Sequence, residues 1–171
     1  MRLNDTYIKT RCWCYGVHIS TYEYQGSTLI DGETFKNSLT GNTSVNLLYY
    51  YTDGPFHDAV KNARAFLQET FQVGQGKPLI QRLDEMREDK QTSQPSIDDT
   101  ASGTGQIARL EGIFPKTIIE VFLEFVRRMD AIWPGIANGS TMVYAPVIEW
   151  DTYWLQVNEN MLTTIPNVCS R

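Results

Sequence analysis

The chain has 171 residues, of which 42% are hydrophobic and 20% are charged, and its formal net charge is −5. This length fits a single domain that can bury a core of its own. The negative charge argues against nucleic acid and anionic membranes as partners, because both are bound through clustered lysine and arginine side chains. The sequence also lacks a run of about 20 apolar residues, the length needed to span a bilayer. We therefore expect one domain over residues 1–171, with no nucleic-acid partner and no membrane partner.

The first residues bear on the location of the protein, and the cysteines bear on disulfide formation and metal binding. Residues 1–5 contain no apolar signal core, so a cytosolic or virion-type protein is expected. Cys12 and Cys14 point to one side of a predicted strand, where a disulfide between them is geometrically awkward. His18 lies on that side as well, but Cys-x-Cys is not the usual zinc spacing and no fourth ligand is evident. The sequence therefore predicts no metal site and no cofactor.

The first third of the chain has the alternation of β-strands. Residues 11–24 alternate aromatic or β-branched side chains with small polar ones, which is typical of a strand. Residues 25–44 are polar and rich in turns, with room for a short strand at 28–30. Residues 45–52 predict a second long strand. Because both faces of that strand are apolar or aromatic, we expect it in the centre of a sheet.

Three segments predict helices. Asp53-Gly54-Pro55 ends the second strand and opens a helix over about 56–72, and a further helix is expected over 78–89. The clearest pattern is at 115–130, where apolar side chains form one stripe and charged side chains occupy the opposite face. The sequence Trp133-Pro134-Gly135 stops this helix.

Strands are expected on both sides of the last helix. Residues 107–113 are short and apolar, and residues 141–150 alternate, with Pro146 placing this strand at an edge or at a bulge. Residues 90–105 are rich in Gln, Ser, Thr, Asp and Gly, which predicts a mobile polar loop. For the tail after residue 150, helix and strand both stay open, with a slight preference for helix.

Together these elements predict an α+β fold. We expect a mainly antiparallel sheet of four to six strands, with two or three helices packed on one of its faces. Because two strand assignments stay uncertain at this point, the order of the strands is left open.

Few residues have the chemistry of a catalytic group. His57 lies at a helix start, where the positive end of the helix favours the neutral imidazole that a general base needs. Glu149 and Asp151 flank Trp150 at a strand end, and two carboxylates beside an aromatic ring can bind a sugar or supply an acid and a base. His57, Glu149 and Asp151 also fit the simpler interpretation of solvent-exposed surface residues without a catalytic role. The sequence carries no phosphate-loop or dinucleotide motif, so an enzyme is the less favoured interpretation.

Aromatic side chains are the remaining clue. Tyr49, Tyr50 and Tyr51 follow one another, so they put rings on both faces of their strand. One face belongs to the core, and the other must be covered by a helix, a partner chain or a ligand. Trp13 and Trp150 lie on other predicted strands, and aromatic side chains with polar tips are frequent in interfaces.

The favoured hypothesis is a non-enzymatic binding or assembly subunit that contacts partner chains through aromatic strand surfaces. Its partners would be further copies of the chain, in a homo-oligomer, or the members of a larger protein assembly. The alternative is a small-molecule-binding enzyme or substrate-binding domain, with a pocket between the sheet and the helices.

Overall fold

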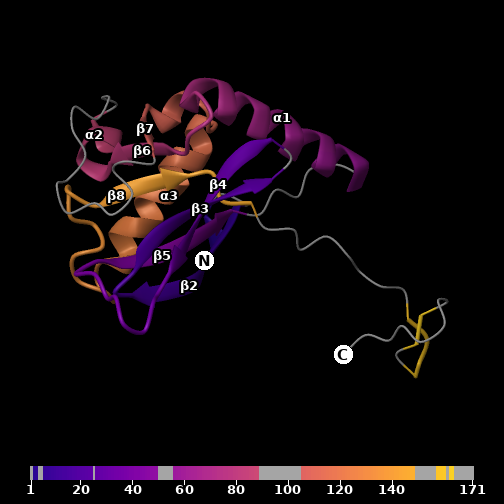
Figure 1. Ribbon diagram of the computed structural model, residues 1–171, viewed down its shortest axis with the longest axis horizontal. Coiled ribbons are helices and arrows are strands. Elements are labelled where there is room, and N and C mark those ends of the chain that lie inside the picture. Colours follow the sequence, from indigo (N-terminus) through magenta and orange to yellow (C-terminus); the bar gives the residue numbers. More distant parts are fainter. Residues whose placement is uncertain are drawn as a thin grey trace.

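The computed structural model describes residues 2–3, 6–24, 26–49, 56–88, 105–148, 157–160 and 162–163. These residues form an α+β fold, as predicted (Figure 1). Its elements in chain order are β1 (Arg2–Leu3), β2 (Thr6–Tyr15), β3 (His18–Tyr24), β4 (Ser27–Glu33), β5 (Thr43–Tyr49), α1 (Phe56–Gly74), β6 (Leu79–Arg82), α2 (Leu83–Arg87), β7 (Gln106–Ile107), the 3₁₀ turn η1 (Leu110–Gly112), α3 (Lys116–Met129) and β8 (Met142–Ala145). Most of the predicted loop at 90–105 and of the tail after 150 lies outside the described residues, so both stay predictions.

The strands form sheets that are smaller than the predicted four to six strands. In the described part of the chain, β1, β2 and β5 pair in that order, β3 pairs with β4, and β7, β6 and β8 form the third sheet. All of these pairs are antiparallel except β6 with β7. A single backbone hydrogen bond of 3.4 Å, from Ile30 N to Pro146 O, links β4 to the residue that follows β8. Among the described residues this bond does not extend into a ladder, so the sheets are separate there.

The strand-like run at 11–24 is in fact two strands. The chain turns at Gly16, whose φ of +65° lies in the left-handed region that favours glycine. A Cβ atom at this position would come within 2.7 Å of Leu39 Cδ2, so there is no room for a side chain either. After the turn, β3 leaves β2 and pairs with β4 as a hairpin.

β5 was expected in the centre of a sheet, and that prediction is wrong for the described residues. The strand ends at Tyr49 and is the last in the order β1-β2-β5. Its two faces meet different layers. Leu47 packs with Ile8 and Phe125, on the side of α3, while Ser44 lies against Gly32 of the β3–β4 hairpin.

The segment predicted as one helix over 78–89 begins as a strand. Leu79 and Ile80 have no exposed surface and belong to β6, which lies between β7 and β8. Only the second half, α2, is helical. The strand forms because its partners at 106–107 and 142–145 are distant in sequence, and pairing with them outweighs the local helical spacing.

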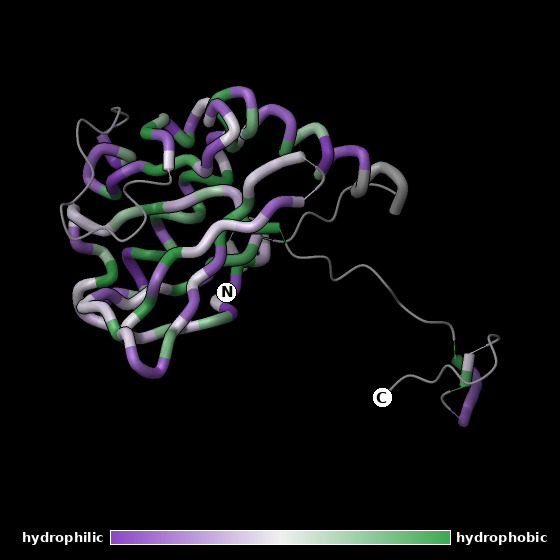
Figure 2. The backbone as a smooth tube through the Cα atoms, viewed as in Figure 1, coloured by the Kyte–Doolittle hydropathy of each residue, from purple (hydrophilic) through white to green (hydrophobic). Residues whose placement is uncertain are grey.

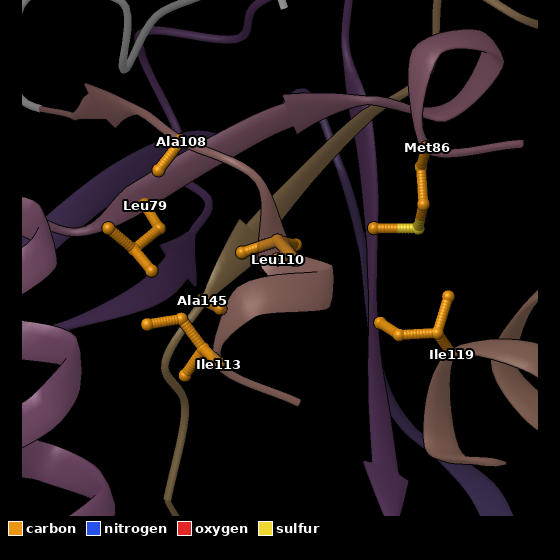
Figure 3. Packing of buried hydrophobic residues seen from close by; sticks show 7 residues of the cluster. All are labelled: Leu79, Met86, Ala108, Leu110, Ile113, Ile119 and Ala145. Carbon is orange, nitrogen blue, oxygen red and sulfur yellow. The ribbon is translucent and has the colours of Figure 1, made fainter. Parts of the chain in front are cut away.

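The helices α1 and α3 agree with their predicted ranges to within about two residues at each end. Figure 2 shows hydrophobic and hydrophilic residues alternating along α1, as expected for a helix with one buried side. Both helices contribute to one core, since Phe66 of α1 and Ile119 of α3 pack in the same cluster. The buried residues of this cluster, drawn in Figure 3, are Leu79, Met86, Ala108, Leu110, Ile113, Ile119 and Ala145.

The two strands expected around α3 are shorter than predicted. Of residues 107–113, only Ile107 pairs, as part of β7, and the chain then turns through η1 to bury Leu110. The later strand, β8, ends at Ala145, immediately before Pro146. It lies at the end of the order β7-β6-β8, which confirms the edge position that Pro146 predicted.

Three charged side chains on the outer surface of α3 make the stability of the fold depend on pH. Glu124 accepts hydrogen bonds from Arg127 Nε (2.7 Å) and Arg128 Nε (2.6 Å). The Arg127 bond first, and then the Arg128 bond, lower the pKa of Glu124 from 4.5 to about 2. Because the folded carboxylate binds its proton less readily than the unfolded one, these bonds stabilise the fold above about pH 4.5. That stabilisation is lost as the pH falls towards 2.

The Glu124→Gln variant should therefore melt slightly below the wild type at pH 7, and at the same temperature near pH 2. The effect is small because the ion pairs are exposed to solvent. Thermal unfolding followed by circular dichroism at both pH values measures it. A gap between the two proteins that is as large at pH 2 as at pH 7 would contradict this account.

Candidate functional site

Five exposed apolar side chains lie near the end of β2. We call them the end surface, and each has between 49% and 79% of its surface exposed. Isolated exposed apolar residues are common and need no explanation, but neighbouring ones often mark an interaction site. The members of the end surface are Trp13, Tyr15, Phe35, Leu39 and Ile132.

The loop between β4 and β5 folds back over the β2–β3 turn and brings Leu39 to Gly16 and Phe35 to His18. Thr34 Oγ1 donates a hydrogen bond of 3.0 Å to Tyr15 O, and Leu39 lies against Gly16. On the next strand, the ring of His18 lies edge-on to Phe35, with 5.4 Å between the ring centroids. The loop is thus held in place by contacts with both strands.

The chain after α3 supplies the other side of the end surface. The indole rings of Trp13 and Trp133 stack with an angle of 29° between their planes. Ile132, the neighbour of Trp133, is 79% exposed. In Figure 1 the segment that follows α3 approaches the β4–β5 loop at the lower left of the molecule. Residues from three separate parts of the sequence therefore meet at this end.

The chemistry of the end surface suits contact with another protein. Its members are aromatic or aliphatic, and the charged residues Arg11, Glu33, Lys36 and Asp130 lie within two residues of them in sequence. Protein interfaces commonly have apolar side chains at the centre and polar groups at the rim. A tyrosine such as Tyr15 adds a large contact area and a hydroxyl group that can form a hydrogen bond.

The structure places two of the five residues predicted to bind partners. Trp13 pairs with Val45, and Tyr49 pairs with Ile8, so both lie on the side of the β2–β5 pair that faces α3. Trp13 is in the end surface, whereas Tyr49 is at the far end of β5. The other three predicted residues, Tyr50, Tyr51 and Trp150, lie outside the described residues.

Most members of the end surface were not predicted from the sequence. Phe35 and Leu39 are isolated apolar residues in a polar, turn-rich segment, and Ile132 follows a helix end. A large apolar residue within a polar loop was the only local signal available. That signal cannot show which other residues come to lie beside it.

The candidate catalytic residues are not brought together by the described part of the chain. The side chain of His57 lies outside the described residues, as do Glu149 and Asp151. Cys14 Sγ donates a weak hydrogen bond to Gly32 O at 3.8 Å, and His18 Nε2 donates one to the Ser38 carbonyl oxygen. Among the residues with described side chains, no three His, Cys, Asp or Glu are grouped to hold a metal ion.

A small hollow lies between the start of β4 and α1. Its volume is about 220 Å³ and its described lining consists of Ser27, Arg64, Leu67 and Gln68. Pockets for small molecules usually have volumes of about 300–1,000 Å³. The hollow thus has the location that a pocket between sheet and helices requires, but it is smaller than such pockets.

Known proteins give no further indication of the activity. No protein-family model matches the chain, and no curated protein matches it. None of the described helices is both long enough and apolar enough to cross a membrane. The geometry of the described residues is therefore the basis for a functional proposal.

Proposed function

We propose that this chain is a non-enzymatic assembly subunit, and that the end surface joins it to further copies of itself. One observation carries the proposal: five large apolar side chains from three separate segments are exposed near the end of β2. Leaving this surface in water is unfavourable, at roughly 25 cal/mol for each Å² of apolar area. Covering it with a second protein surface removes that cost.

The contacts within the end surface support the proposal, because they fix the side chains before a partner arrives. Trp13 is held by its stack on Trp133, and the loop that carries Phe35 and Leu39 is tied to β2 and β3. A surface that is already ordered loses little conformational entropy when it binds. Aromatic side chains held in this way are the residues that most often dominate the binding energy of an interface.

The Tyr15→Ser variant should weaken self-association by about tenfold or more, the effect of losing one dominant interface residue. Tyr15 is 67% exposed, so its replacement leaves the core intact. Light scattering behind a size-exclusion column, over a range of concentrations, measures the effect as a lower average molar mass.

A matched control is Tyr22→Ser, which removes an exposed tyrosine from β3 away from the end surface. This control should keep the molar mass of the wild type. The proposal is contradicted if Tyr15→Ser is folded, by circular dichroism, and has the wild-type molar mass at every concentration.

The alternative function, small-molecule binding or catalysis in a pocket, has weaker support. Its best location is the hollow at Arg64 and Gln68, which could accept only a small ligand with a group that a guanidinium can bind. The side chains of the candidate residues His57, Glu149 and Asp151 lie outside the described residues, so their part in such a site stays a prediction.

A further inference from the structure

The chain contains a single Asn-Gly pair, Asn138-Gly139, in the segment between α3 and β8. Asn138 is exposed, and its Oδ1 accepts hydrogen bonds from Ser140 N (3.0 Å) and Ser140 Oγ (2.9 Å). An asparagine that bonds in this way to the backbone N–H two residues later forms an Asx turn. The side chain of Asn138 is therefore folded over the peptide bond that joins it to Gly139.

This turn brings the side-chain amide of Asn138 towards the backbone nitrogen of Gly139. The ring of atoms that the hydrogen bond from Ser140 N closes contains both Asn138 Cγ and Gly139 N. Because glycine has no Cβ atom, no side chain at position 139 shields this nitrogen. Among the described residues, no backbone carbonyl oxygen accepts a hydrogen bond from Gly139 N. Holding two reacting groups close together within one chain strongly favours their reaction.

The two donors of Ser140 favour the same reaction. If Gly139 N adds to Asn138 Cγ, negative charge develops on Asn138 Oδ1. Hydrogen-bond donors that are already in place stabilise such a charge, as they do in an oxyanion hole. Ser140 supplies one donor from its backbone and one from its hydroxyl group.

We propose that Asn138 is a site of spontaneous deamidation, assisted by the hydroxyl group of Ser140. Gly139 N gives up its proton to the solvent and forms a bond to Asn138 Cγ, and the bond from Cγ to Nδ2 breaks. Nδ2 leaves as ammonia after taking a proton from the solvent, and a five-membered succinimide ring remains. Water then opens the ring at either carbonyl, which gives aspartate or isoaspartate. One water molecule is consumed, one ammonia is released, and the chain gains one negative charge.

The product should weaken the contact between this turn and the start of α2. Gly139 O accepts a hydrogen bond of 3.1 Å from Asp84 N, and Thr141 O accepts one of 2.9 Å from Leu83 N. Isoaspartate lengthens the backbone by one methylene group just before these two carbonyl groups, so they cannot both keep their positions. A Cβ atom at Gly139 would be 3.0 Å from Asp84 Cβ, so the new charge arises one residue from a contact with another carboxylate.

Peptide mapping by mass spectrometry, during incubation in warm and mildly alkaline buffer, measures the reaction at each asparagine. Asn158 is the internal control. Its Oδ1 also accepts two backbone hydrogen bonds, from Asn160 N and Leu162 N, but the next residue is Glu159, whose side chain shields the backbone nitrogen. We expect Asn138 to be converted while Asn158 stays an amide.

Ser140→Ala tests the part that the hydroxyl group plays. In the folded protein this variant should convert Asn138 severalfold more slowly than the wild type. The loss should be smaller than the roughly 100-fold that an enclosed oxyanion hole loses with one donor, because water can replace an exposed hydroxyl group. In urea, where the turn is absent, both proteins should react at the same rate.

The isoaspartate form, isolated by chromatography, should unfold at a lower urea concentration than Asn138→Asp, which has the charge without the extra methylene group. The inference is overturned if Asn158 is converted before Asn138. It is also overturned if folded Ser140→Ala reacts at the wild-type rate, or if the isoaspartate form is as stable as Asn138→Asp.

Discussion

Replacing Leu79 by alanine is expected to lower the free energy of unfolding by about 3–5 kcal/mol. Leu79 has no exposed surface and lies at the first position of β6, the middle strand of its sheet. Figure 3 shows it between Ala108 and Ile113 in the core cluster. The substitution removes three carbon atoms from a site enclosed by several elements, which cannot all move inward to fill the space. The cost therefore includes both the lost burial and the remaining cavity.

Urea unfolding at equilibrium measures this change. The control is Leu162→Ala, the same substitution at a residue that is 50% exposed, which should change the free energy of unfolding by less than about 0.5 kcal/mol. A loss below about 1 kcal/mol for Leu79→Ala would show that β6 is not part of the main core.

Replacing Gln81 by leucine is expected to cost about 2–4 kcal/mol, although leucine is the more hydrophobic residue. Gln81 is fully buried in β6. Its Oε1 accepts a hydrogen bond of 2.9 Å from Leu110 N, and its Nε2 donates one of 3.2 Å to Glu111 Oε2. Leucine leaves the backbone N–H and the carboxylate without these bonds, and Glu111 Oε1 is already buried without a hydrogen-bond partner. Unsatisfied buried polar groups are costly, and a carboxylate costs more than an amide.

The comparison with Gln72→Leu isolates the effect of burial. Gln72 is exposed on α1, so the same substitution there should change the stability by less than about 0.5 kcal/mol. Both variants can be followed by urea unfolding. If Gln81→Leu and Gln72→Leu were equally stable, the hydrogen bonds of the Gln81 side chain would not stabilise the contact between β6 and η1.

The sequence predicted the two long helices because their patterns are local. In α3, an apolar stripe recurs with helical spacing between a proline at the start and Trp133-Pro134-Gly135 after the end. Every residue that decides this pattern lies within the segment itself. The α+β class followed in the same way, from helices interspersed with alternating segments.

The errors fall where distant segments decide the structure. Residues 79–82 have apolar spacing that a helix could also use, but they become β6 because β7 and β8 lie on either side. β5 has two apolar faces because α3 and the hairpin cover them, not because strands flank it. Local periodicity cannot separate these causes, since it records only that a face is buried.

The candidate site was predictable only in part. Trp13 was identified as an aromatic residue on a strand and is 58% exposed, and its role in binding stays a prediction. Phe35, Leu39 and Ile132 join it only because the β4–β5 loop and the chain after α3 fold towards the same end. Their grouping is a property of the tertiary structure, so one sequence alone could not reveal it.

The most direct test of the account is the molar mass of the wild-type protein in solution, measured by light scattering over a range of concentrations. The end surface predicts an assembly of at least two chains of 19.6 kDa each. The average molar mass should fall towards that of one chain with Tyr15→Ser. A wild-type protein that stays at the mass of a single chain at every concentration would contradict the account.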